Sequence, residues 1–170
     1  MAEASLAGPD IIAALKKAGI EFIAAVPDIV TSQGLLWPIA RGREFRLVRL
    51  CKEDEGVSVC AGLAVAGKRA ALLIQHTGFL DSLNAIRGIA CELGQPVCLL
   101  VGLLAKEPGV APTQSSSFGV RIVEPILDAL GIEHFCIEGP REIAMLPGAI
   151  DRAYAQSRPT AALFGRTVAP

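Results

Sequence analysis

Short apolar runs alternate with amphipathic stretches along the whole chain. The runs have the length of buried strands, and most are bounded by glycine, proline or charged residues. The predicted strands span residues 20–26, 45–50, 69–75, 97–104, 132–137 and 160–168. Because helical stretches separate successive runs, the pattern predicts an α/β fold, with a doubly wound, six-stranded, mostly parallel sheet and helices on both faces.

The segments between the strands carry helical periodicity and helix-boundary residues. Helices are predicted over residues 9–18, 35–39, 54–66, 82–93, 120–130 and 141–156. The stretch 54–66 is built almost entirely of small and apolar residues, so we expect it to be buried. Residues 76–80 are predicted as a turn, with Asp81 capping the helix that follows. Residues 106–118 are rich in Pro, Gly, Ser and Thr and are predicted as a loop.

The composition narrows the class of protein. Apolar residues make up 52% of the chain and charged residues 19%, which fits a well-filled core under two covered sheet faces, a large interface, or both. A net charge of -1 without a basic stripe argues against nucleic acid as a partner. No apolar run approaches the roughly 20 residues of a membrane helix, so no membrane role is expected.

The five cysteines are odd in number, and no two of them form a Cys-x-x-Cys pair. We interpret them as reduced, small apolar residues. Together with an N-terminus that lacks the basic and apolar regions of a signal peptide, this predicts a cytoplasmic protein. We expect one domain over residues 1–170, because no repeat, linker or low-complexity tract divides the chain.

The turns after the predicted strands are the candidate site, because ligands of open parallel sheets bind beyond the carboxyl ends of the strands. The turn after Leu50 holds three acids, Glu53, Asp54 and Glu55, where the apolar helix begins. Two interpretations are open. The acids are either anions that favour the helix dipole, or one of them is a carboxyl group that keeps a proton for a ligand beside an apolar surface.

A second candidate turn follows Gln75 and contains His76, Thr77 and Gly78. The glycine indicates close approach by a ligand or by backbone. His76 is one of two histidines, and it is interpreted either as a pocket residue or as a structural one. No glycine-rich dinucleotide motif, P-loop or zinc-ligand spacing is present in the sequence, so we expect no bound dinucleotide and no protein-ligated metal.

The acidic turn at Glu53, the turn after Gln75 and several other short motifs together resemble the pyrimidine-binding (PYR) domain of thiamine-diphosphate-dependent decarboxylases. The family places a glutamate nine residues before a glycine, and Glu53 and Gly62 have that spacing. The resemblance is strongest to the alpha subunit of sulfopyruvate decarboxylase and to the N-terminal part of phosphonopyruvate decarboxylase. The other matching segments are Val26-Pro27-Asp28, Cys60–Ala64, Gly67–Leu73, Gln75-x-x-Gly78 and Leu127–Gly131.

This resemblance implies a cofactor, a reaction and roles for individual residues. Glu53 would be the catalytic residue that hydrogen-bonds the aminopyrimidine of thiamine diphosphate, so that the cofactor can attack a small 2-oxo acid, whose second anionic group would be a sulfonate. The implied cofactor-binding residues are Glu53, Gln75, Thr77 and Gly78. Asp28 and His76 are candidates for the substrate pocket, although Asp28 is also explained as a turn-forming residue.

The resemblance also implies a missing half. The family binds Mg²⁺ and the diphosphate through a Gly-Asp-Gly motif, which this sequence lacks. We therefore expect a beta subunit that carries this diphosphate-binding (PP) domain, together with self-association of PYR domains through helices 54–66 and 82–93. Ile29, His76 and Leu80-Asp81 depart from the family pattern. Carboligation, aldehyde transfer and a non-catalytic regulatory role remain the alternatives.

Overall fold

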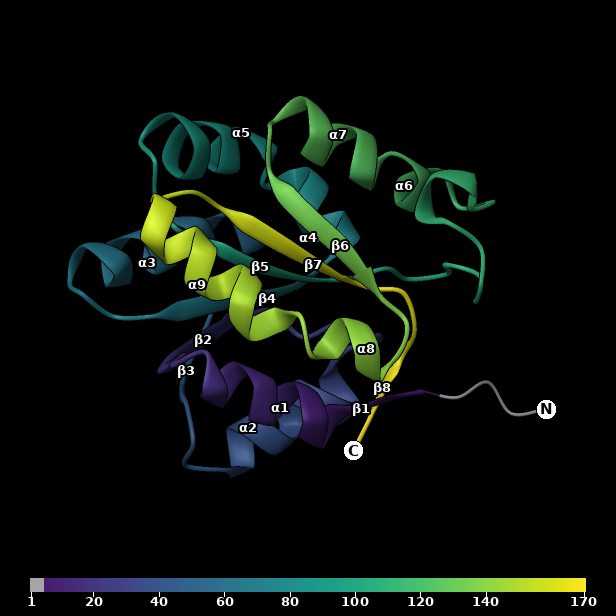
Figure 1. Ribbon diagram of the computed structural model, residues 1–170, viewed down its shortest axis with the longest axis horizontal. Helices are drawn as coiled ribbons and strands as arrows, with labels where there is room; N and C mark the ends of the chain where they lie inside the picture. The colour runs from purple at the N-terminus through teal and green to yellow at the C-terminus, as the bar shows by residue number, and fades with distance from the viewer. Residues whose placement is uncertain (1–4) are drawn as a thin grey trace.

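The computed structural model describes residues 5–170 and contains a parallel sheet between two layers of helices (Figure 1). The sheet has six strands in the order β3-β2-β4-β5-β7-β6, and every neighbouring pair is parallel. The predicted fold class is confirmed. The strands are β2 (Phe22–Ala25), β3 (Arg46–Arg49), β4 (Ala70–Gln75), β5 (Cys98–Gly102), β6 (Glu133–Ile137) and β7 (Thr160–Phe164).

A second, two-stranded sheet joins the ends of the described chain. Its strands, β1 (Leu6–Ala7) and β8 (Val168–Ala169), pair in parallel. The sequence predicts one long strand over residues 160–168, but the chain leaves the main sheet after Phe164 and then pairs with β1. Strands of two residues carry no readable periodicity, which explains why this small sheet is absent from the prediction.

The helices and helical turns connect successive strands. They are α1 (Gly8–Lys17), η1 (Ser32–Leu36), α2 (Trp37–Arg41), α3 (Glu53–Val65), α4 (His76–Asp81), α5 (Leu83–Ala85), η2 (Ile86–Glu92), η3 (Pro112–Gln114), α6 (Phe118–Arg121), α7 (Val123–Ala129), α8 (Pro140–Ile143) and α9 (Leu146–Gln156). The segment predicted as one helix over residues 82–93 is largely the π-helical η2. Residues 76–80, predicted as a turn, form most of α4.

Alternate residues of the strands point to opposite helix layers. Leu73 and Leu100 belong to the core beneath α1, α2, α8 and α9, whereas Leu72 and Val101 belong to the core beneath α3 to α7. All four side chains are buried. The central strands are therefore apolar on both faces, as buried parallel strands require. Within residues 5–170, no helix combines the length and apolarity needed to cross a membrane.

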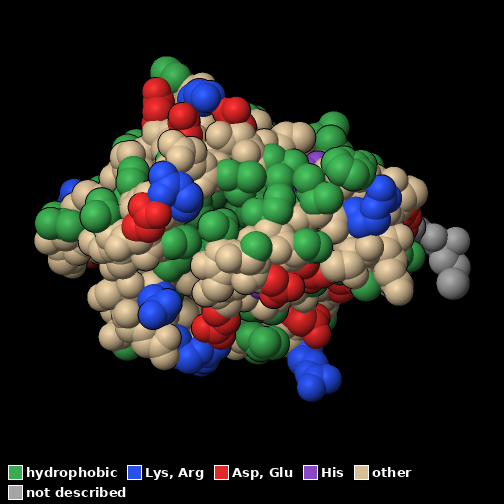
Figure 2. Space-filling view, turned by 90° about the horizontal axis from the view of Figure 1, so that it is seen from above, with side chains coloured by type: hydrophobic (Ala, Val, Ile, Leu, Met, Phe, Trp, Pro, Cys, Tyr) green, Lys and Arg blue, Asp and Glu red, His purple; other side chains and the backbone are tan. Residues whose placement is uncertain are grey.

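The layer of α3 to α7 leaves apolar side chains partly uncovered. Figure 2 shows this face, with apolar side chains across its middle and charged side chains around them. The prediction that helix 54–66 is buried is correct for one side of α3, because Val57, Cys60 and Ala61 are buried, but Gly62 and Val65 are exposed. The partly buried apolar residues of this layer are Val59, Leu63, Leu80, Leu83, Ala85, Ile89, Cys91, Ile126 and Leu130.

Candidate active site

Glu53 and Gly78 meet at the carboxyl edge of the sheet, although they follow different strands. Glu53 is the first residue of α3 and Gly78 lies in the first turn of α4. A Cβ atom added to Gly78 would lie 2.5 Å from Oε1 of Glu53, which is closer than any real contact. Glycine at position 78 therefore creates the space in which the Glu53 carboxyl group rests on the backbone of α4.

Glu55, two residues further on, caps the start of α3. Its Oε2 accepts hydrogen bonds from the backbone N–H groups of Cys51 (3.1 Å) and Lys52 (3.4 Å) and thereby closes the start of α3. Such a reciprocal cap uses the side chain of the third helical residue. The two interpretations of the acidic turn are thus divided between two residues, with Glu55 stabilising the helix start and Glu53 lying against Gly78.

Gln75 lies at the end of β4 and lines an open cavity of about 400 Å³. Its side-chain Oε1 accepts a hydrogen bond from Thr77 Oγ1 at 2.9 Å. Gln75 is half-buried and Thr77 is exposed, so both can reach a ligand at this edge. The residues around the cavity are Pro27, Asp28, Ile29, Ser32, Gln33, Trp37 and Gln75.

Asp28 lines the same cavity, but its carboxylate also organises the turn after β2. Oδ1 accepts hydrogen bonds from the backbone N–H groups of Val30 (2.6 Å) and Thr31 (2.8 Å), and Oδ2 accepts one from the Thr31 hydroxyl. The backbone N–H of Asp28 donates to Ser32 Oγ at 2.9 Å. This is the turn-forming arrangement that the sequence left open, and the role of Asp28 in the substrate pocket stays a prediction.

His76 points into the protein. It is buried, and its Nδ1 accepts a hydrogen bond from the backbone N–H of Leu104 at 3.2 Å. A Cβ atom on Gly119 would lie 2.9 Å from its Nε2. Burial lowers the pKa of His76 from its usual 6.5, and a backbone hydrogen bond with Gly102 opposes that shift in part. The neutral imidazole thus links α4 to the segment after β5, and its proposed contact with substrate stays a prediction.

Asp81 neither caps a helix nor faces the cavity beside Gln75. It ends α4, and no side-chain cap is formed at Ser82, where the next helical segment begins. Its carboxylate instead pairs with Lys52 Nζ at 3.0 Å, and both side chains are about half exposed. The capping prediction is wrong because residues 76–80 are already helical, which moves the start of the helix to the end of β4.

The structure adds residues that the sequence interpretation did not select. Gln33 in η1 and Trp37 in α2, two elements that follow the Asp28 turn, line the Gln75 cavity. A single tryptophan in the chain was the available signal. Within residues 5–170, no group of three or more His, Cys, Asp or Glu side chains is placed to hold a metal ion.

Comparison with known proteins identifies the family. No protein-family model matches the sequence. The sulfopyruvate decarboxylase subunit alpha of Methanocaldococcus jannaschii is 30% identical over 152 residues, which cover 89% of this chain and 88% of the relative. The chain belongs to the sulfopyruvate decarboxylase alpha-subunit family. The family prediction made from Glu53, Gly62 and the surrounding motifs is therefore confirmed.

One further sequence relative and one solved structure of similar fold are longer than this chain. The sulfopyruvate decarboxylase of Methanosarcina acetivorans is 28% identical over 161 residues, which cover 93% of this chain but 40% of that protein. The solved 2-oxoglutarate:ferredoxin oxidoreductase from Magnetococcus marinus superposes on 93% of this chain and 28% of its own, with a TM-score of 0.64 and 17% identity. At that identity the likeness establishes a shared fold.

Proposed function

We propose that this chain is the alpha subunit of a split thiamine-diphosphate-dependent 2-oxo acid decarboxylase of the sulfopyruvate type. The observation that carries the proposal is the position of Glu53, whose carboxyl group lies on Gly78 at the carboxyl edge of the sheet. Membership of the sulfopyruvate decarboxylase alpha-subunit family supports the same assignment. In this proposal residues 1–170 form the PYR domain.

The residues present fit the aminopyrimidine part of the cofactor. The absence of a Cβ at Gly78 lets the Glu53 carboxyl group lie against the backbone of α4. Gln75, the last residue of β4, and Thr77, in the first turn of α4, add an amide and a hydroxyl at the same sheet edge, and both side chains have donor and acceptor atoms. A flat ring with ring nitrogens and an amino group requires such a mixed set of partners. Glu53, Gln75, Thr77 and Gly78 are therefore the residues that would hold the ring.

The proposed chemistry of the site depends on a proton that Glu53 shares with the cofactor. When bound, thiamine diphosphate supplies the carbon nucleophile and the electron sink for the loss of CO₂. Glu53 holds a proton at the pyrimidine ring nitrogen N1′ and takes it back, as a general acid and base. Ile29 and Trp37 contribute apolar surface to the lining of the Gln75 cavity. His76 keeps α4 and the segment after β5 together beneath the site.

A partner subunit completes this site in the proposal. The sequence contains no Gly-Asp-Gly motif, so Mg²⁺ and the diphosphate would be bound by a beta subunit with the PP domain. The uncovered apolar face over α3 and η2 is the surface on which we place self-association of PYR domains (Figure 2). The five cysteines are unpaired, which supports a cytoplasmic location, where thiols stay reduced.

The substrate class gives the first test. We expect a small 2-oxo acid with a second anionic group, because the chain belongs to the sulfopyruvate decarboxylase alpha-subunit family. Asp81, whose charge would repel such a group, pairs with Lys52 and does not line the Gln75 cavity. The reconstituted complex should prefer sulfopyruvate over pyruvate and over branched-chain 2-oxo acids by at least about tenfold in kcat/KM, which corresponds to about 1.4 kcal/mol. Rates of CO₂ release over this panel measure the preference. A tenfold preference for pyruvate or a branched-chain acid would contradict the anionic-substrate assignment.

A further inference from the structure

The short helix α4 carries the backbone on which the Glu53 carboxyl group rests, but it is a weak element by itself. It has six residues, its start at Gln75 has no side-chain cap, and glycine at position 78 disfavours a helix. A helix of this length is not stable in isolation. Contacts with other segments therefore fix where Gly78 lies.

Two buried side chains hold the later part of α4. Phe79 is completely buried in the core beneath α3 to α7. Ser82, which follows the helix, donates from its hydroxyl to the backbone oxygen of Gly78 at 2.7 Å. Burial of an apolar ring is not directional, whereas a hydrogen bond fixes an orientation. The start of the helix requires a directional contact of its own.

His76, the first residue of α4, makes that contact. Its Nδ1 accepts a hydrogen bond from the backbone N–H of Leu104 at 3.2 Å. Its ring also packs on Gly119 in α6, where an added Cβ atom would lie 2.9 Å from Nε2. Glycine at position 119 therefore lets the imidazole lie against the backbone of α6.

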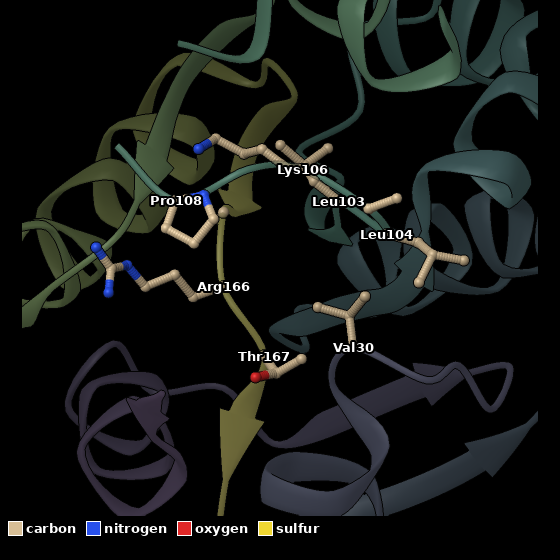
Figure 3. Close-up of a pocket in the computed structure, with 9 residues that line it drawn as sticks. Val30, Leu103, Leu104, Lys106, Pro108, Arg166 and Thr167 are labelled. Carbon is tan, nitrogen blue, oxygen red and sulfur yellow. The ribbon is translucent and has the colours of Figure 1, made fainter. Parts of the chain in front are cut away.

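The segment that donates this hydrogen bond is itself held in place. The backbone N–H of Leu103 donates to the oxygen of Phe164 in β7 at 3.0 Å. The side chain of Lys106 is 1% exposed and pairs with Glu138, which follows β6. Figure 3 shows this segment beside a small cavity, with Lys106 extending to one side and Leu104 lying on the other. The segment after β5 is thus a fixed support for α4.

We propose that His76 is a positioning residue for Glu53. The unprotonated Nδ1 of His76 fixes the first turn of α4, and the backbone of Gly78 in that turn fixes the Glu53 carboxyl group. This role requires no contact between His76 and substrate. Its effect on catalysis rests on the proposed function, whereas the positioning itself is measurable in the chain alone.

The protonation state of His76 decides whether the contact exists, because an Nδ1 that carries a proton cannot accept a hydrogen bond from Leu104. Burial lowers the pKa of His76, and a backbone hydrogen bond with Gly102 opposes that shift in part. The neutral ring therefore dominates at and above the usual value of 6.5. The contact is lost as the pH falls through the lowered pKa.

The charged side chains of the elements around the imidazole have other partners. They are Asp81 in α4, Lys106 and Glu107 after β5, and Arg121 in α6. Their partners are Lys52 for Asp81, Glu138 for Lys106, the hydroxyl groups of Ser115 and Ser116 for Glu107, and the backbone oxygens of the same two serines for Arg121. The imidazole is therefore the group whose titration controls the contact.

The first measurement uses the isolated chain, without cofactor or partner subunit. Long-range ¹H–¹⁵N NMR spectra of the histidine rings at neutral pH should show Nδ1 of His76 unprotonated and Nε2 protonated. His134 is the internal control, because its Nδ1 lies 3.0 Å from the backbone oxygen of Ile132 and must carry a proton to bond with it. A proton on Nδ1 of His76 at neutral pH would overturn the proposal.

Two variants test the positioning. His76→Leu removes the acceptor but keeps a buried side chain of similar size, so the Leu104 amide should lose about tenfold or more of its protection from hydrogen exchange. The ¹³C signal of the Glu53 carboxyl group should shift as well. His76→Asn should restore both, because its side-chain oxygen can accept the same hydrogen bond. Unchanged protection and an unshifted Glu53 signal in a folded His76→Leu would overturn the proposal.

The same two signals test the pH dependence. In the wild-type chain, both should change as the ring of His76 titrates, over a series from about pH 8 to about pH 4. Glu53 also titrates by itself, and His76→Asn should keep that step while losing the one that follows the imidazole. A ring that titrates without any change in either signal would contradict the role of His76.

The reconstituted complex separates this inference from the proposed function. His76→Leu should lower kcat for CO₂ release about tenfold with KM nearly unchanged, and His76→Asn should recover most of the loss. A change in KM rather than kcat, with the Leu104 amide still protected, would make His76 a substrate contact and overturn the positioning role. An inactive wild-type complex would contradict the decarboxylase assignment and leave the NMR results for His76 valid.

Discussion

Glu53→Gln should slow hydrogen–deuterium exchange at C2 of the bound cofactor by about two orders of magnitude or more, in line with the usual size of general acid–base catalysis. Glutamine preserves the size of the side chain and its packing on Gly78, but it cannot hold and return a proton. Folding and assembly should stay intact, because no apolar contact is removed. Exchange is measured by NMR after rapid quenching, in the complex with the partner subunit.

Glu55→Gln is the matched control for that experiment. Glutamine can still accept the hydrogen bonds from the backbone of Cys51 and Lys52, so the cap survives. Loss of the anion near the helix start should cost about 0.3–1 kcal/mol of stability and leave exchange nearly unchanged. Normal exchange in Glu53→Gln with a large loss in Glu55→Gln would show that the catalytic carboxyl group had been assigned to the wrong residue.

Gly62→Arg should abolish assembly through the α3 face without destabilising the single subunit. Gly62 is exposed, and a Cβ atom added there meets nothing within 4 Å. Removing glycine from a helix interior gains up to about 1 kcal/mol, whereas an unpaired charge buried in an interface costs several. We expect the self-association constant to fall more than 100-fold, measured by sedimentation velocity, while the melting temperature of the subunit holds or rises.

A control variant on the opposite helix layer tests whether the effect is specific to the α3 face. Ala13→Arg adds the same charge on α1, in the opposite helix layer, and should leave assembly unchanged. Ala61 is the wrong position for the test despite its place beside Gly62, because it is 6% exposed and lies in the core. Unchanged association in Gly62→Arg, or a monomeric wild-type chain at micromolar concentration, would contradict an interface on this face.

The sequence predicted the sheet well because its central strands are buried on both faces. Strands such as β4 and β5 are continuous apolar runs, and few other structures require such runs. That Glu53 and Gly78 lie close together could also be predicted, because both residues follow parallel strands and the carboxyl ends of parallel strands meet at the same edge of the sheet. The Glu53–Gly62 spacing then singled out one acid of three.

The features that escaped prediction depend on contacts between distant residues. The ring of His76 accepts a hydrogen bond from the backbone N–H of Leu104, which lies 28 residues away in the sequence. No local sequence pattern reveals that His76 is buried. The α4 helix begins at His76 although glycine at position 78 weakens it, and the Glu53 side chain packs against that glycine. The Lys106–Glu138 pair joins residues 32 positions apart in the sequence, so no local pattern reveals it.

CO₂ release from sulfopyruvate, measured for this chain alone and after mixing with a subunit that carries the Gly-Asp-Gly motif, tests the central claim most directly. The proposal predicts no detectable rate for either subunit alone and a rate that rises on mixing until the two are equimolar. It also predicts that the Glu53→Gln chain forms the same complex without restoring the rate. Robust CO₂ release by the purified chain alone, or full activity of the mixed complex with Glu53→Gln, would contradict it.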